Sequence, residues 1–185
     1  MKYIKYLPIL LITLSLGCSK QSPESQKQVV SSNNTYSNTV DFAVSLIEAQ
    51  ASYQMNCVGV YDLLERAAKL EREGFSFYEL KSSFKETDLS YLERLANNSI
   101  RSFESARADF DKLIINNKIK ISPEFKEYFI EFGQILEKNQ RFCYNLNRGE
   151  YTISYISGWV EQSERAKYLI NLMDIECKKL LNEGK

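Results

Sequence analysis

Apolar residues recur every three or four positions along most of the chain, and they do so most regularly between about residues 88 and 117. Residues three and four apart lie on the same face of a helix, so this pattern predicts an amphipathic helix. We expect the helix to begin at Thr87 or Asp88 and to end near Asn117. Its inward face is predicted to consist of Leu89, Leu92, Ala96, Ser99, Phe103, Ala106, Phe110 and Leu113.

A long helix is also expected before this segment, from about Asp41 to Glu73. Aspartate is a good residue with which to cap the start of a helix, and Gly74 is a typical stop. Its inward face is predicted to consist of Leu46, Gln50, Tyr53, Cys57, Val60, Leu64 and Ala67.

Two further long helices are expected after it. Ser122 can cap the third helix, Pro123 suits a first helical position, and the helix should end at Arg148, before Gly149. The last helix is expected over about 150–182. The inward face of the third helix comprises Phe125, Phe129, Phe132, Leu136, Asn139, Cys143 and Leu146. That of the last comprises Ile156, Trp159, Ser163, Ala166, Ile170, Met173, Cys177 and Leu180.

The segment between the first two long helices is too apolar for a plain loop. Ser76 and Glu79 have the spacing of a capping box, which predicts a short helix ending near Glu86. We expect it to cover one end of the core, and a mobile lid is the alternative. The predicted fold is therefore all-α: an antiparallel four-helix bundle of long helices, with an extra short helix between helices 1 and 2.

The start of the chain has the layout of an export signal. Lys2 and Lys5 precede an apolar run from Leu7 to Leu16, and Gly17 and Cys18 close it. The run has roughly half of the twenty or so apolar residues that a membrane-spanning helix needs.

The stretch from residue 14 to Cys18 resembles the lipobox of bacterial lipoproteins, although Ser15 stands where the family usually has leucine. The resemblance implies cleavage before Cys18 and attachment of lipid, such as palmitate, to its thiol. It also implies that Ser19 directs the protein to the outer membrane if the cell is Gram-negative. An ordinary secreted protein is the alternative.

The chain is thus expected to have three parts. Residues 1–17 form a lipoprotein signal peptide, residues 18–40 form a lipidated cysteine and a flexible polar tether, and residues 41–185 form the helical bundle. The tether is rich in Ser, Gln and Asn, so it has little apolar surface to offset the entropy of ordering.

The composition argues against an enzyme and against a cofactor. The chain has no histidine, which removes the usual ligands and bases of haem, di-iron, zinc and Ser-His sites, and its seven glycines form no phosphate loop. We therefore expect no metal and no catalytic residue. Lys and Arg number 24 and Asp and Glu number 24, so no binding of nucleic acid is expected.

Three cysteines remain if Cys18 carries lipid. Cys57 and Cys143 are expected at similar heights in the bundle, whereas Cys177 is displaced along it, so a disulfide between Cys57 and Cys143 is favoured. The alternative is three buried free thiols that act as small apolar residues.

Aromatic residues gather around the turn between the last two helices. Tyr144, Tyr151, Tyr155 and Trp159 form a candidate surface for binding a partner, because tyrosine and tryptophan offer large contact areas with few rotatable bonds. The alternative is that these residues cap the core of the bundle.

These features together predict a noncatalytic, membrane-anchored envelope lipoprotein. It would bind another envelope protein, as an inhibitor, an immunity-type protector, an adaptor or an assembly factor, through a helix face or the aromatic cluster. The alternative function is a carrier that holds a small hydrophobic ligand inside the bundle, which would require an internal cavity.

Overall fold

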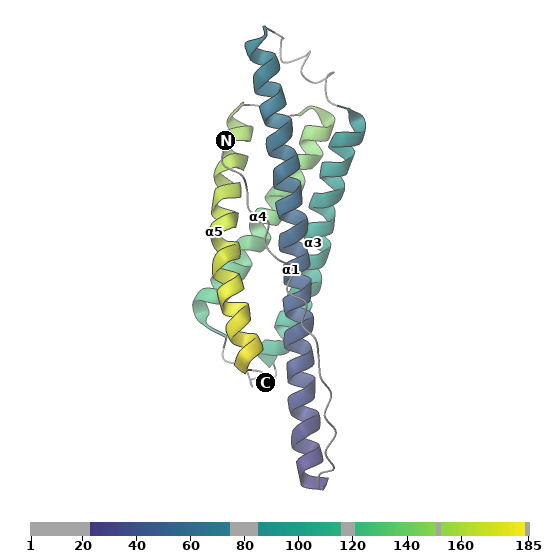
Figure 1. Ribbon diagram of the computed structural model, residues 1–185, viewed down its shortest axis with the longest axis vertical. Helices are drawn as coiled ribbons and strands as arrows, with labels where there is room; N and C mark the ends of the chain where they lie inside the picture. Colours follow the sequence, from purple (N-terminus) through teal and green to yellow (C-terminus); the bar gives the residue numbers. More distant parts are fainter. Residues whose placement is uncertain (1–22, 75–84, 116–120, 151–152, 184–185) are drawn as a thin grey trace.

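The computed structural model describes residues 23–74, 85–115, 121–150 and 153–183, and in these ranges the chain is all-helical. Four helices pack together (Figure 1): α1 (Pro23–Arg72), α3 (Glu86–Ile115), α4 (Pro123–Arg148) and α5 (Ile153–Glu183). The all-α class is confirmed. The expected short helix over 76–86 falls almost entirely outside the described residues.

Each helix packs against two neighbours, and α1 and α4 also meet in the middle of the domain. α1 contacts α3 and α5, and α4 contacts the same two helices. Across the interior, the ring of Phe42 in α1 lies 6.1 Å from that of Phe125 in α4, and Tyr53 lies 5.8 Å from Phe132. The interior is therefore filled by side chains that reach across the diagonal.

α1 begins at Pro23, inside the segment predicted to be a flexible tether, rather than near Asp41. The prediction depended on burial, and buried side chains do start close to the expected place, with Thr39 and Phe42. Helix formation has other requirements: proline is tolerated in a first turn, and no further proline or glycine occurs before Gly59. The first part of α1 consequently extends past the ends of the other helices (Figure 1).

The ends of α4 lie where the sequence predicted them. The Ser122 hydroxyl accepts a hydrogen bond of 3.1 Å from the amide of Phe125, which satisfies one of the free donors of the first turn. Gly149 ends the helix in a left-handed conformation with φ of 71°, which glycine adopts without a steric penalty. α1 ends in a similar way, at Gly74 with φ of 88°.

The predicted inward faces form the core. Every residue predicted to face inward in α3 and α4 is buried. In α5 all are buried except Ile156, and in α1 the last two, Leu64 and Ala67, are half-buried. The expected amphipathic pattern is therefore confirmed over most of its length.

One part of the core is almost wholly aromatic, and we call it the phenylalanine cluster: Phe42, Phe103, Phe110, Phe125 and Phe129. The ring centroids of Phe129 and Phe103 are 4.6 Å apart, and those of Phe129 and Phe110 are 4.7 Å apart. Gly133 makes room for this packing, because a Cβ atom there would lie 2.5 Å from Cε1 of Phe103. None of the helices in the described ranges is long and apolar enough to span a membrane.

Candidate functional site

Two buried amides and the buried indole form one hydrogen-bonded chain, which we call the Asn–Trp network. The indole Nε1 of Trp159 donates to Oδ1 of Asn139 at 2.7 Å, and Nδ2 of Asn139 donates to Oδ1 of Asn56 at 3.0 Å. Nδ2 of Asn56 in turn donates to the carbonyl oxygen of Leu92 at 2.7 Å. These residues come from α5, α4, α1 and α3, so the network joins all four helices.

Trp159 belongs to this interior and not to a binding surface. Its side chain is 3% exposed, it stacks on Phe142 with centroids 5.2 Å apart, and Tyr61 meets it edge-on at 5.1 Å. The prediction that Trp159 lies on a partner-binding surface is wrong. The three-four spacing of apolar residues, which placed Trp159 on the inward face of its helix, predicted its position correctly. The free energy gained by burying the large indole ring exceeds the gain from leaving its polar edge in water.

The other members of the predicted aromatic surface are not brought together as one patch. Tyr144 is 44% exposed, but the guanidinium carbon of Arg148 lies 3.5 Å from its ring centroid. Tyr151 lies outside the described residues, and so does the side chain of Tyr155. No described contact therefore links Tyr144 to a shared binding surface.

Other exposed tyrosines are covered in the same way. Arg94 lies 5.2 Å from the ring centroid of Tyr91, and Arg165 lies 5.2 Å from that of Tyr168. A cation over an aromatic ring is a favourable contact that shields part of the ring from water. These tyrosines are thus capped by arginines of their own helices.

The three described thiols are free and buried. The disulfide expected between Cys57 and Cys143 is not formed in this structure. The structure agrees with the alternative, in which all three cysteines are buried free thiols. Sγ of Cys143 instead lies 3.3 Å from Nδ2 of Asn56, in the Asn–Trp network. Burial raises the pKa of Cys57 to about 11 and that of Cys143 and Cys177 to about 12, so all three stay protonated at neutral pH. A protonated, enclosed thiol is a poor nucleophile.

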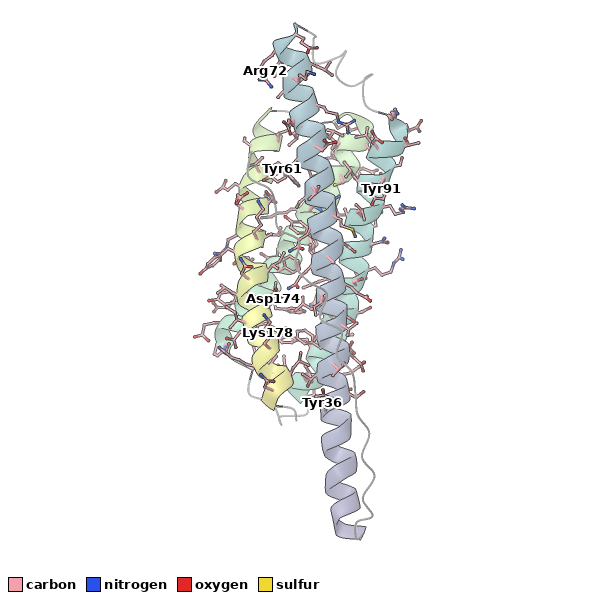
Figure 2. The ribbon with its side chains drawn as sticks, in the orientation of Figure 1. Tyr36, Tyr61, Arg72, Tyr91, Asp174 and Lys178 are labelled. Atoms are coloured by element: carbon pink, nitrogen blue, oxygen red, sulfur yellow. The ribbon has the colours of Figure 1, made fainter. Side chains whose placement is uncertain are left out.

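One carboxyl group is partly withdrawn from water. Asp174 is half-buried on α5, and desolvation raises its pKa, while the neighbouring charge of Lys178 acts in the opposite direction. Figure 2 shows the two residues on consecutive turns of the helix. The side-chain amide of Gln50 on α1 also acts to lower the pKa of Asp174.

The described residues include no group of acidic and cysteine side chains that could hold a metal ion. Two small grooves open at the surface. One, of about 300 Å³, lies between α1 and α3 beside Glu48, Ala51 and Arg101. The other, of about 310 Å³, lies between α3 and α4 beside Arg107 and Glu137. Both have mixed charge, so neither has a clear preference for an anion or a cation.

The most distinctive surface is an apolar strip on α1 that the sequence reasoning missed. We call it the outer stripe: Val44, Ile47, Ala51, Met55 and Val58. The four large side chains are between 49% and 62% exposed, and Ala51 is exposed as well. Steps of three, four, four and three place them on one face, opposite the buried residues.

A signal for the outer stripe was present in the sequence. The same spacing rule that selected the inward face of this helix also selects a second apolar face beginning at Val44. One apolar face is sufficient for a helix to pack in a bundle, so the spacing rule assigns a role to the inward face and none to the second face. The comparisons with known proteins add no guide to the site: no family model, curated protein or solved structure matches the chain.

Proposed function

We propose that this protein is a noncatalytic lipoprotein of the bacterial cell envelope, anchored by lipid on Cys18, that binds another protein through a helix face. The outer stripe of α1 is the observation that carries the binding part of this proposal. Contiguous exposed apolar patches on soluble domains commonly mark binding sites. In a Gram-negative cell, Ser19 favours the outer membrane as the site of the anchor.

The domain that presents this face is, in this proposal, an antiparallel four-helix bundle. The order of contacting residues supports the arrangement. Ser99 of α3 bonds to the carbonyl of Ala49, and Asn56 bonds to that of Leu92, so the numbers rise in α1 as they fall in α3. In α1 and α5, Tyr61 lies 2.6 Å from Ser163, and the side-chain amide of Gln50 lies beside Asp174, so the numbers again run in opposite directions.

A binding role agrees with how the chain uses its chemically active groups. The thiols are protonated and enclosed, and the amides of Asn56 and Asn139 and the indole of Trp159 are hydrogen-bonded to one another in the Asn–Trp network. The alternative function, a carrier for a small hydrophobic ligand, would need space in the interior. The phenylalanine cluster and the rings of Tyr53 and Phe132 occupy that space, which argues against the carrier.

The anchor is tested by replacing Cys18 in the full-length protein expressed in a bacterium. We expect the natural protein to take up labelled palmitate and to sediment with membranes, and Cys18→Ala to do neither. Cys177→Ala is the matched control, because it removes a buried thiol and should leave labelling unchanged. Equal membrane attachment of the natural protein and Cys18→Ala would contradict the lipid anchor.

The binding face is tested with charge substitutions at equally exposed sites. Ile47 in the outer stripe is 55% exposed and Ile130 on α4 is 60% exposed, so glutamate at either position should leave the fold intact. Crosslinking in intact cells should lose its protein adducts with Ile47→Glu and keep them with Ile130→Glu. Loss of the same adducts with both variants would show that the stripe has no special role.

A further inference from the structure

The outer stripe is left uncovered by the helices of its own chain. Its side chains point away from the core, since Leu46, Tyr53 and Val60 on the opposite face are at most 2% exposed. Elsewhere on the described helices, α3 exposes Tyr91, Ile114 and Ile115, α4 exposes Ile130 and Tyr144, and α5 exposes Tyr168 and Ile175. No face of these three helices carries more than two of them at helical spacing, so the outer stripe is the longest exposed apolar row on the described residues.

We propose that the outer stripe packs against the outer stripe of a second copy of this chain, with the two α1 helices parallel. The proposal rests on the proposed function, because it names the partner of the proposed binding face and takes its orientation from the proposed anchor. It commits to a symmetric pair in which the same surface of each copy forms the interface.

The distribution of charge favours self-pairing of this face. In a parallel two-fold pair, residues near the axis meet their own counterparts, so any charge there would meet a like charge. The five residues of the stripe carry no charge, and the exposed Glu48 lies at the edge of the stripe, beside the groove that it lines with Arg101 of α3. The next residue on the same face, Asp62, is already paired with Arg66 at 3.1 Å.

The outward face of α3 is less suited to meeting its own copy. Arg94 and Arg101 are exposed there, seven positions apart on one face of the helix, and Lys112 on the same face is paired with Asp109 at 2.7 Å. A two-fold pair formed through α3 would place these cations opposite their counterparts. Like charges in contact oppose association, so α1 is the helix on which a symmetric interface is favourable.

The anchor and the shape of α1 determine the orientation. Cys18 precedes the first residue of α1, Pro23, by five positions (23 − 18), so lipid on Cys18 would hold the start of every α1 near the same membrane. Two copies on one membrane then present parallel helices. α1 also extends past the other helices (Figure 1), so its first turns lie beyond α3, α4 and α5.

The size of the stripe predicts how strong the pair is. From Val44 to Val58 it is roughly 21 Å long, on a helix about 10 Å wide, so it offers a few hundred Å². A standard stable interface buries about 800 Å² on each partner. We therefore expect weak pairing of the domain in solution and stronger pairing on the membrane, where anchoring raises the effective concentration.

Cysteine crosslinking in the full-length, membrane-bound protein tests both the contact and its direction. Val44→Cys and Val58→Cys, each made alone, should give at least roughly five-fold more disulfide-linked dimer than the natural protein under a mild oxidant, because anchoring keeps the two copies together. An antiparallel pair would instead link Val44→Cys only to Val58→Cys when the two variants are mixed, which would overturn the parallel arrangement. The control, Ser105→Cys on the exposed face of α3, should stay at the level of the natural protein.

A charge in the stripe should abolish the crosslink. Ile47→Glu added to Val58→Cys should reduce the dimer to the level of the natural protein, whereas Ile130→Glu should leave it unchanged. No increase for either single cysteine variant, or equal yields for all variants including Ser105→Cys, would overturn the proposal.

The contact can be tested separately from the anchor. Val58→Cys combined with Cys18→Ala removes the proposed lipid site, and at high protein concentration this variant should still form the linked dimer. If Cys18→Ala leaves membrane attachment unchanged, the anchor fails while the crosslink still reports on the stripe. If attachment is lost and no dimer forms at any concentration, the stripe pairing fails while the anchor stands.

Discussion

The phenylalanine cluster and the Asn–Trp network lie in the same core but hold it together in different ways. Phe42 and Asn56 are 14 positions apart on α1 (56 − 42), and Phe129 and Asn139 are 10 apart on α4 (139 − 129), so the two regions are separated by about 15 to 21 Å along the helices. The cluster packs rings at centroid distances from 4.6 to 6.4 Å, with both stacked and edge-on arrangements. The network instead consists of directed hydrogen bonds of 2.7 to 3.0 Å that join all four helices.

The difference indicates a division of labour. Burial of aromatic surface is not directional, so it supplies stability without demanding one position of each helix. A buried amide must find a partner in the right place, because an unsatisfied polar group in the core costs free energy. The cluster is therefore expected to contribute most of the stability, and the network to select one register of the helices.

The largest expected effect comes from the centre of the cluster. Phe129→Ala removes a ring that contacts four others, so the free energy of unfolding should fall by about 3–5 kcal/mol, as measured by urea denaturation. The neighbouring Ile130→Ala, at a site that is 60% exposed, is the control and should change it by less than about 0.5 kcal/mol. A loss below about 1 kcal/mol for Phe129→Ala would mean that the cluster does not dominate the core.

The next largest effect is expected in the network. Asn139→Leu leaves the indole N–H of Trp159 without a partner and leaves Oδ1 of Asn56 with only the weak donor of Cys143, at 3.7 Å, so the cost should be about 2–4 kcal/mol, at about 1–3 kcal/mol for each group. Adding Trp159→Phe removes one of the unsatisfied groups.

The double variant should therefore cost less than the sum of the two single variants. A double-mutant cycle by urea denaturation measures this coupling. Strictly additive losses would show that the residues act by packing alone, as in the phenylalanine cluster.

The two regions were not equally predictable from the sequence. Four of the five rings of the cluster follow from the three-four spacing of apolar residues, whereas Phe42 was not among the predicted inward residues. The ends of α4 follow from local chemistry at Ser122 and Gly149. These features depend on neighbours in sequence. The network joins Asn56 to Asn139, 83 positions apart, and a single stripe gives no sign of such a pair.

The same reasoning explains the errors at both ends of the domain. For Trp159, the spacing of apolar residues predicted a place on the inward face, and the residue type predicted a place on a binding surface. Only tertiary packing decides between these two positions. The start of α1 at Pro23 was not predicted, because the segment before Asp41 has few apolar residues to bury, and a helix can form without burying them. The outer stripe was not predicted because the fold requires only one apolar face on α1, and the second face has no part in the packing of the bundle.

A moderate effect is expected when the buried thiols lose their protons. Burial raises their pKa above the unfolded value of 9.0, to about 11 for Cys57 and about 12 for Cys143 and Cys177, so the folded state holds these protons more tightly than the unfolded state. Their contribution to stability is complete below pH 9 and is lost as the pH rises through the folded pKa values. Each thiol should contribute a slope of at most about 1.4 kcal/mol per pH unit.

Urea denaturation between pH 8 and 11 measures this slope for the natural protein and for variants with one thiol fewer. Cys143 is hydrogen-bonded in the network and Cys177 lies outside it, so Cys143→Ala and Cys177→Ala compare the titration of a thiol in the network with that of a buried thiol elsewhere. Each variant should have a shallower slope than the natural protein. Unchanged slopes in both variants would mean that other groups, such as the tyrosines, govern alkaline unfolding.

The smallest expected effect lies outside both regions, where a polar contact faces water. Arg165 of α5 donates two hydrogen bonds, of 2.7 and 2.6 Å, to the carboxylate of Glu131 on α4, and the side chains are 44% and 38% exposed. Because water screens this pair, Arg165→Met should lower the free energy of unfolding by about 0.2–1 kcal/mol, and less in high salt. Urea denaturation at low and high salt checks both expectations, with Lys179→Met, which removes a pair within one helix, as the control. A loss of unfolding free energy as large as that of Asn139→Leu would contradict this explanation of the Asn–Trp network. The explanation is that the network stabilises the fold because it is enclosed from water, and not because of its number of hydrogen bonds.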